Sequence, residues 1–146
     1  MKRENPAKAF LRRYQGLNRR MDALTRAIAQ AMERATNISV TLKDVRVMSS
    51  PAEHDPMAAD VCTAVDACAM LYREKAEAEK ALRQILTAIN SVPDERQRAV
   101  LTMRYINGDN FAKIAQEMNY SEPAIYVAHG RALVTINKWM EVNLHE

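Results

Sequence analysis

The chain has 146 residues, of which 48% are hydrophobic and 27% are charged, as expected for a folded domain and not for a disordered segment. Three glycines and five prolines are too few for the closely spaced turns of a β-sandwich or a β-barrel. Alanine, methionine, glutamate and arginine, which favour helices, are all common. The composition therefore predicts an all-α protein.

The sequence lacks the signals of several functional classes. No uncharged run approaches the ~18 residues of a membrane span, and no apolar segment follows the basic N-terminal residues as in a signal peptide. Cys62 and Cys68 fall on different sides of a helix, which argues against a disulfide between them and favours a cytoplasmic protein. The histidines and cysteines do not have metal-ligand spacing. The sequence also lacks a phosphate loop, a nucleophile elbow and a clustered carboxylate pair. We therefore expect no metal, no cofactor, no catalytic residues and no enzyme activity.

The net charge of +3 is unevenly distributed along the chain. Residues 1–35 carry nine Lys or Arg against three Asp or Glu, residues 36–91 carry six against eight, and residues 92–146 carry six against seven. A basic segment is a candidate electrostatic footprint for nucleic acid. The candidate phosphate contacts are Arg12, Arg13, Arg19, Arg20 and Lys113. The alternative for the arginines is a solvated helix face, or a face that pairs with the acidic middle segment.

Residues 1–90 contain two long helical patterns. From about Pro6 to Ala35, apolar residues recur at alternating spacings of four and three, and the same heptad spacing returns from about Met57 to Asn90. Between them, Pro51 and Pro56 and a two-residue apolar spacing predict a non-helical crossover at about 37–56. We expect a coiled-coil-like hairpin that serves for oligomerisation. Its apolar stripes could pair within one chain or between two chains. Because one narrow seam buries little surface, a homodimer is favoured.

Residues 91–146 follow the pattern of a three-helix, helix-turn-helix domain. Ser91 is a good N-cap for a first helix, and Asn107-Gly108 marks its end. A second helix is expected from Phe111 to Met118, followed by a left-handed turn residue at Asn119. Ser121 caps a third helix, whose apolar stripe includes Ile125, Ala128, Ala132, Leu133, Ile136 and Trp139.

Several motifs of this segment resemble region 4 of sigma-70-type factors. They are Val92-Pro93-Asp94-Glu95-Arg96, Arg104-Tyr105 with Gly108, Ile114-Ala115, Ser121-Glu122-Pro123-Ala124-Ile125 and Arg131-Ala132-Leu133. The resemblance covers about residues 91–139. With the heptad-bearing segment and the Val45–Pro51 stretch, the whole chain resembles phage and prophage late-transcription regulators of the ArpU/RinA type. The resemblance implies a cytoplasmic, sequence-specific DNA-binding transcriptional regulator that binds double-stranded DNA.

The third helix of such a domain presents its first turns to the major groove. The candidate DNA contacts, which point away from its apolar stripe or match the positions of sigma-type contacts, are Ser121, Glu122, Pro123, Tyr126, Val127 and Arg131, with His129 at the edge of the same face. Two of them have structural alternatives, because Tyr126 could cover the helix junction and Arg131 could pair with Glu117 or Glu122. These candidate contacts also include few cations, which favours weak DNA binding by a single domain.

Two other functions fit the same pattern. The domain could dock on RNA polymerase, as region 4 of sigma factors also does, with little DNA contact of its own. Alternatively, a helix-turn-helix joined to an oligomerising coiled coil could be a DNA-packaging adaptor that resembles a small terminase subunit. DNA affinity with and without polymerase distinguishes the first alternative, and the mass in solution distinguishes the second.

Overall fold

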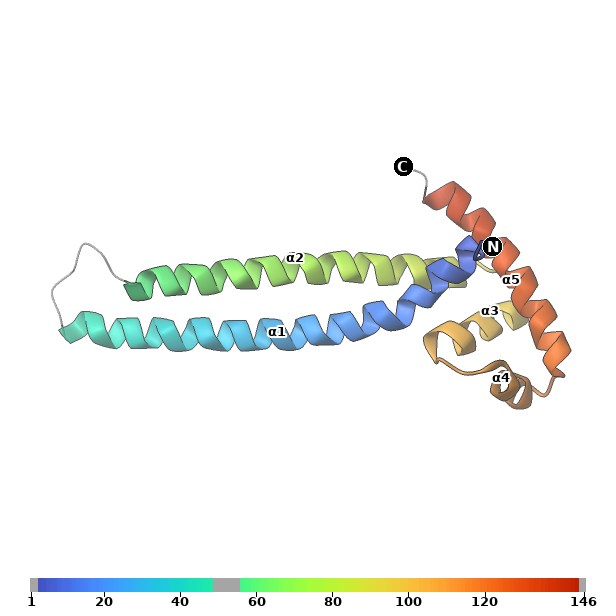
Figure 1. Ribbon diagram of the computed structural model, residues 1–146, viewed down its shortest axis with the longest axis horizontal. Coiled ribbons are helices and arrows are strands. Elements are labelled where there is room, and N and C mark those ends of the chain that lie inside the picture. Colours follow the sequence, from blue (N-terminus) through green and yellow to red (C-terminus); the bar gives the residue numbers. More distant parts are fainter. Residues whose placement is uncertain (1–2, 49–55, 145–146) are drawn as a thin grey trace. The chain divides into compact units, whose positions relative to one another are not determined.

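The computed structural model describes residues 3–48 and 56–144, which are all-helical apart from short turns (Figure 1). The helices are α1 (Pro6–Met48), α2 (Pro56–Asn90), α3 (Glu95–Leu101), α4 (Phe111–Met118) and α5 (Glu122–Asn143), with a π-helical turn η1 (Thr102–Ile106) directly after α3. The predicted all-α fold class is therefore confirmed.

Contacts divide the chain into two compact units. The first, called the head here, contains residues 3–19 and 80–144, and the second, called the arm, contains residues 20–48 and 56–79. The sequence pattern predicts a boundary near residue 90. In the structure, the first turns of α1 and the last turns of α2 pack with the C-terminal helices.

The main core of the head explains this division. It joins Phe10 and Leu11 of α1 to Ile85 and Ile89 of α2 and to Ile136 of α5, all of them buried. The aromatic rings of Phe10 and Trp139 add to this core, with centroids 6.2 Å apart. At the start of α1, the Asn137 side chain accepts a hydrogen bond from Ala7 N at 3.0 Å, so α5 also satisfies a backbone donor that the helix leaves unpaired.

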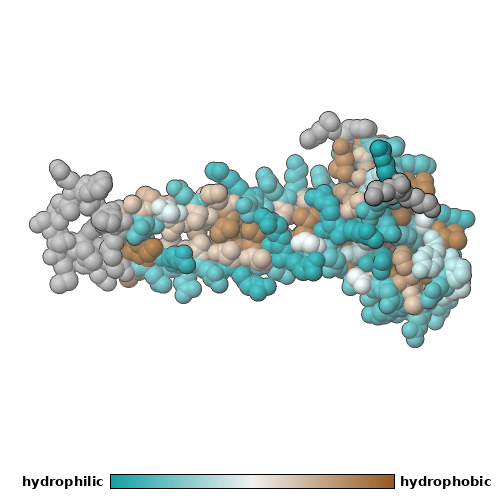
Figure 2. Space-filling view, in the orientation of Figure 1, coloured by the Kyte–Doolittle hydropathy of each residue, from teal (hydrophilic) through white to brown (hydrophobic). Residues whose placement is uncertain are grey.

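The two helices of the arm lie side by side and run in opposite directions (Figure 1). Leu24 and Ile28 of α1 and Ala64 and Ala78 of α2 are buried, and all four belong to the predicted heptad stripes. Lys75, which interrupts the stripe of α2, is only half-buried. Hydrophilic residues line both long edges of the arm in Figure 2. The stripes thus pair within one chain, which the sequence pattern had left open.

The predicted non-helical crossover at 37–56 is wrong for residues 37–48, because α1 continues to Met48. The segment from Asn37 to Met48 contains neither proline nor glycine, and β-branched residues lower helix propensity by only about 0.5 kcal/mol each. The two-residue apolar spacing favours an extended segment, but no residue in this segment ends a helix. The prediction is also wrong for Pro56, the first residue of α2, and its remaining part, residues 49–55, lies outside the described residues. Over the described ranges, no helix is long and apolar enough to cross a membrane.

Candidate nucleic-acid interface

The first helix of the C-terminal segment begins later than the sequence indicated. Asp94 is the N-cap of α3, and its carboxylate accepts a hydrogen bond from Gln97 N at 3.0 Å. Ser91, the predicted cap, instead donates from its hydroxyl to Ala88 O at 2.6 Å at the end of α2. Because α2 extends to Asn90, Ser91 closes that helix and the cap moves to the residue after Pro93.

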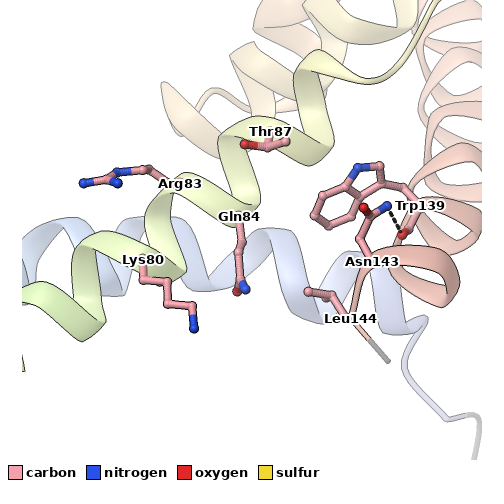
Figure 3. Close-up of a pocket in the computed structure, with 7 residues that line it drawn as sticks. All are labelled: Lys80, Arg83, Gln84, Thr87, Trp139, Asn143 and Leu144. Atoms are coloured by element: carbon pink, nitrogen blue, oxygen red, sulfur yellow. Dashed lines mark hydrogen bonds between the residues drawn. The ribbon is translucent and has the colours of Figure 1, made fainter. Parts of the chain in front are cut away.

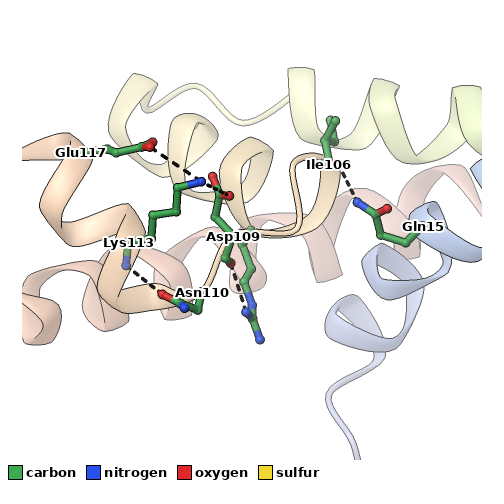
Figure 4. A network of polar contacts seen from close by, with 7 residues as sticks. Gln15, Ile106, Asp109, Asn110, Lys113 and Glu117 are labelled. Carbon is green, nitrogen blue, oxygen red and sulfur yellow. Dashed lines mark hydrogen bonds and ion pairs between the residues drawn. The ribbon is translucent and has the colours of Figure 1, made fainter.

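The Arg-Tyr-x-x-Gly motif forms the bend that leads into α4. Gly108 has φ +78°, a conformation that residues with a Cβ rarely adopt, which confirms the predicted stop. The Gln15 side chain of α1 donates to Ile106 O at 2.6 Å and to Tyr105 O at 3.2 Å, so it caps the carbonyls at the end of η1 (Figure 4). Arg104 donates to Asp109 O at 3.1 Å and fixes the other side of the bend.

Helices α4 and α5 and the turn at residues 119–121 form a helix-turn-helix. Asn119 is left-handed, with φ 59° and ψ 41°, as the sequence predicted, and Tyr120 N donates to Ala115 O at 3.0 Å. Ser121 caps α5 by accepting from Ala124 N at 3.3 Å. Ile114 and Ala115 of α4 pack with Ile125, Ala128 and Val100 in a second buried cluster, and this cluster holds the two helices at the turn.

Six of the seven residues selected on and beside the third helix share an exposed surface. They are Ser121, Glu122, Pro123, Tyr126, Val127 and Arg131, whereas Ile125, Ala128 and Ala132 on the other side are buried. The exposed row begins at the first residue of α5, directly after the turn. In a helix-turn-helix these are the positions that reach base edges.

The structure also bears on the alternatives for Tyr126 and Arg131. The Tyr126 ring lies 4.7 Å from the Phe111 ring, so it does cover the helix junction, yet 53% of the residue remains exposed. Within the described residues, Arg131 forms no ion pair with Glu117 or Glu122. The guanidinium of Arg131 is therefore available to a partner outside the chain.

His129 is a core residue and does not belong to this surface, which corrects the sequence analysis. Only 8% of it is exposed, and its Nε2 atom lies 2.7 Å from the Tyr105 hydroxyl. Its ring also contacts Phe111 edge-on, with centroids 5.0 Å apart. The helical period places residue 129 next to Ile125 and Ala132, so it follows the buried stripe of α5.

The candidate phosphate contacts are exposed, and three of them already have carboxylate partners. Arg12 pairs with Glu4, Arg20 pairs with Glu74 at 3.0 Å, and Lys113 pairs with Asp109 at 3.1 Å (Figure 4). Arg13 and Arg19 are exposed on the part of α1 that belongs to the head. Exposed pairs contribute about 0–1 kcal/mol, so phosphate could displace these carboxylates at small cost.

Arg96 lies beside the turn and is not among the contacts predicted from the sequence. The Arg96 guanidinium lies 4.4 Å from the centre of the Tyr120 ring, in the geometry of a cation–π contact. Tyr120 belongs to the turn before α5, so Arg96 adds an exposed cation near the start of the candidate interface. The two residues are far apart in sequence, and no local pattern signals the contact.

Residues 82–136 match the family model of sigma-70, region 4. Among curated proteins and solved structures, none matches the chain. The match supports a DNA-binding role in the regulation of transcription.

The region 4 match begins within α2, earlier than the resemblance noted in the sequence. This start agrees with the core of the head, in which Ile85 and Ile89 of α2 are buried together with α5. The end of α2 therefore belongs to the part of the chain that matches region 4, and it packs with α5 there.

A pocket of about 290 Å³ lies partly beyond the region 4 match. Lys80 and Arg83 of α2 and Trp139 and Asn143 of α5 are among its lining residues (Figure 3). The Asn143 amide donates to Trp139 O at 2.8 Å, which closes the end of α5. About eight residues of helix, or about 12 Å, separate Trp139 in this pocket from Arg131, the last residue of the exposed row. The pocket is thus not part of the candidate interface.

Proposed function

We propose that this protein is a sequence-specific transcriptional regulator of phage or prophage origin, without enzyme activity, that acts in the bacterial cytoplasm. The observation that carries the proposal is the exposed row on α5, which follows a capped, left-handed turn in a region 4-like domain. A helix so placed enters the major groove with its N-terminal residues next to base edges. The late-regulator type is supported by the order of segments, a heptad-bearing arm followed by a sigma-like domain.

The exposed row offers a specific set of contacts to DNA. The Glu122 carboxylate can accept a hydrogen bond from cytosine N4, and Pro123 and Val127 can contact a thymine methyl group. Arg131, one helical turn or more further along α5, suits guanine or a phosphate. Tyr126, held against Phe111, supplies a rigid aromatic edge between these groups.

Electrostatics favours two heads per molecule. Residues 92–146 carry six Lys or Arg and seven Asp or Glu, so one head neutralises few phosphates. A homodimer doubles these contacts, and the second head binds at a high effective concentration. Arg12, Arg13 and Arg19 of α1 would add contacts that do not depend on sequence.

Docking on RNA polymerase is the second candidate function. It is favoured by the apolar part of the same surface, where Tyr126, Val127 and Val134 are each more than half exposed. Exposed aromatic and aliphatic residues suit a protein partner as well as thymine methyl groups.

The test is fluorescence anisotropy of the full chain on a duplex selected from a random library, over a salt series. Tyr126→Ala combined with Arg131→Ala should weaken binding at least about tenfold, because each base or phosphate contact contributes about 1–3 kcal/mol. Arg12→Ala with Arg13→Ala should mainly flatten the dependence on salt. Arg34→Ala, an exposed arginine of the arm, is the control and should change neither.

The outcomes separate the two functions. A selected consensus that depends on Tyr126 and Arg131 supports the regulator. If no consensus emerges, and binding of RNA polymerase depends on the same two residues, the head is a polymerase-docking module and the proposal is wrong.

A further inference from the structure

The arm has a second row of uncharged residues beside its packed seam. The row lies one residue beyond the heptad stripe on each helix, and its members are Ala29, Met32 and Thr36 on α1 and Val65, Ala69 and Tyr72 on α2. All six are exposed, with exposed fractions of 50% for Met32, 53% for Val65 and 49% for Tyr72. We call this surface the uncharged face.

A contact between the two helices shows that both rows lie on one side of the arm. The Tyr72 hydroxyl lies 3.4 Å from Met32 Sδ. The ion pair of Arg20 with Glu74, whose residues stand one position before the stripes, marks the opposite side. The Thr36 hydroxyl donates to Met32 O at 2.9 Å, so covering this residue would leave no unpaired hydroxyl donor. The face can therefore be buried without a polar penalty from its threonine.

The arm also has little interior of its own. Its described buried residues are Leu24, Ile28, Ala64 and Ala78, two of which are alanine. Helices of this length gain most of their stability from tertiary packing, and one narrow seam supplies little of it. Covering the uncharged face would turn the two-helix arm into a four-helix bundle with a second packed layer.

Charged residues flank the face in a pattern that identifies the occupant. Arg26 and Glu33 border it on α1, and Asp66 and Arg73 border it on α2; all four are exposed. The contacts of Arg20 with Glu74 and of Met32 with Tyr72 place Arg26 level with Arg73, and Glu33 level with Asp66. One end of the face is thus flanked by two cations and the other by two carboxylates, about 10 Å further along the helices.

We propose that a second copy of this chain covers the uncharged face with its own, and that the two arms run antiparallel. In this arrangement α1 packs on α1 and α2 on α2, so Arg26 meets Glu33 of the partner subunit and Arg73 meets Asp66 of the partner subunit. Ala29 and Ala69, midway between the charged pairs, lie at the two-fold axis, where small residues allow close approach. The inference rests on the proposed homodimer and adds its surface, direction and register.

Charge also excludes the parallel arrangement. Two arms facing each other in the same direction would bring α1 against α2 at equal levels, so Arg26 would face an arginine and Glu33 an aspartate. Like charges opposed in an interface are unfavourable, whereas the antiparallel two-fold pairs every flanking charge with its opposite.

Sedimentation equilibrium of the full chain at low salt, without DNA, tests the arrangement. Asp66→Arg and Arg73→Asp should each weaken dimerisation about tenfold, because each reversal creates two symmetry-related like-charge contacts. The double reversal should restore the dissociation constant to within about threefold of wild type, since it exchanges the partners of the same pair. Asp60→Arg, an exposed reversal that stands one position before the stripe of α2, is the control and should have no effect.

Three results would overturn the inference, and circular dichroism confirms that each variant is folded. Stronger dimerisation after the single reversals indicates parallel arms. Single reversals without effect place the dimer contact elsewhere on the chain. A monomer at all concentrations refutes the proposed homodimer as well.

Discussion

At the scale of single residues, a buried hydrogen bond ties η1 to α5. The Tyr105 hydroxyl and His129 Nε2 are 2.7 Å apart, and Tyr105 belongs to the main core of the head. Burial, followed by the positive charges of Lys8 and Arg104, lowers the pKa of His129 to about 4. Burial likewise raises the pKa of Tyr105. Both groups are therefore held neutral near pH 7.

This pair predicts a loss of stability in mild acid. In the unfolded chain His129 takes up a proton near pH 6.5, whereas in the native state it does so only near pH 4, so the unfolded state binds more protons in this window. The free energy of unfolding should fall by about 2–3 kcal/mol between pH 7 and pH 4 through this residue. Urea denaturation at several pH values measures it.

The matched variant is His129→Gln, which keeps a hydrogen-bonding group near Tyr105. It should be less stable than wild type at pH 7 but should lose less stability on acidification. An equal pH dependence in both proteins would show that the pKa of His129 is the same in the native and the unfolded state, which would contradict the prediction.

At the scale of elements, local signals located most of the C-terminal helices. The bounds of α4, the left-handed Asn119 and the Ser121 cap follow from residues that satisfy backbone groups within a few positions. The incorrect or missing predictions concern a helix that lacks a stop signal and residues at positions 96 and 129. α1 continues to Met48 because nothing breaks it, and Arg96 owes its place to Tyr120, which no local pattern connects to it. His129 differs, because the helical period of α5 already places it next to the buried Ile125 and Ala132.

Two glycines inside helices give a paired prediction. A Cβ added at Gly16 of α1 or at Gly130 of α5 would meet no atom within 4 Å. Gly16→Ala and Gly130→Ala should therefore each stabilise the protein by about 1 kcal/mol, since alanine has the higher helix propensity. Thermal unfolding measures the gain.

DNA binding should distinguish the two variants. Gly130 is exposed beside Arg131 on the surface assigned to DNA, so the added methyl group should weaken binding severalfold. Gly16→Ala should bind as wild type. Equal affinities for both variants would mean that the backbone at Gly130 does not approach DNA.

At the scale of the whole molecule, the positive charge and the candidate base-reading residues lie on different parts of the chain. The net charge of +3 arises from residues 1–35, whereas residues 92–146, which carry the exposed row of α5, are slightly acidic. Phosphate attraction supplies most non-specific affinity, and base contacts supply specificity. Under the proposed function, α5 therefore reads the DNA sequence, the basic part of α1 adds affinity that does not depend on sequence, and a pair of chains adds avidity.

The most direct test of the central claim is a selection of binding sites from random DNA with the wild-type chain and with Glu122→Gln. Glutamate accepts from cytosine N4, whereas glutamine pairs with adenine, so the consensus should change at one base pair of each half-site and stay the same elsewhere. The substitution is nearly isosteric at an exposed position, so the fold should be unaffected. An identical consensus for both proteins, or none for either, would contradict the assignment of α5 as the helix that reads DNA.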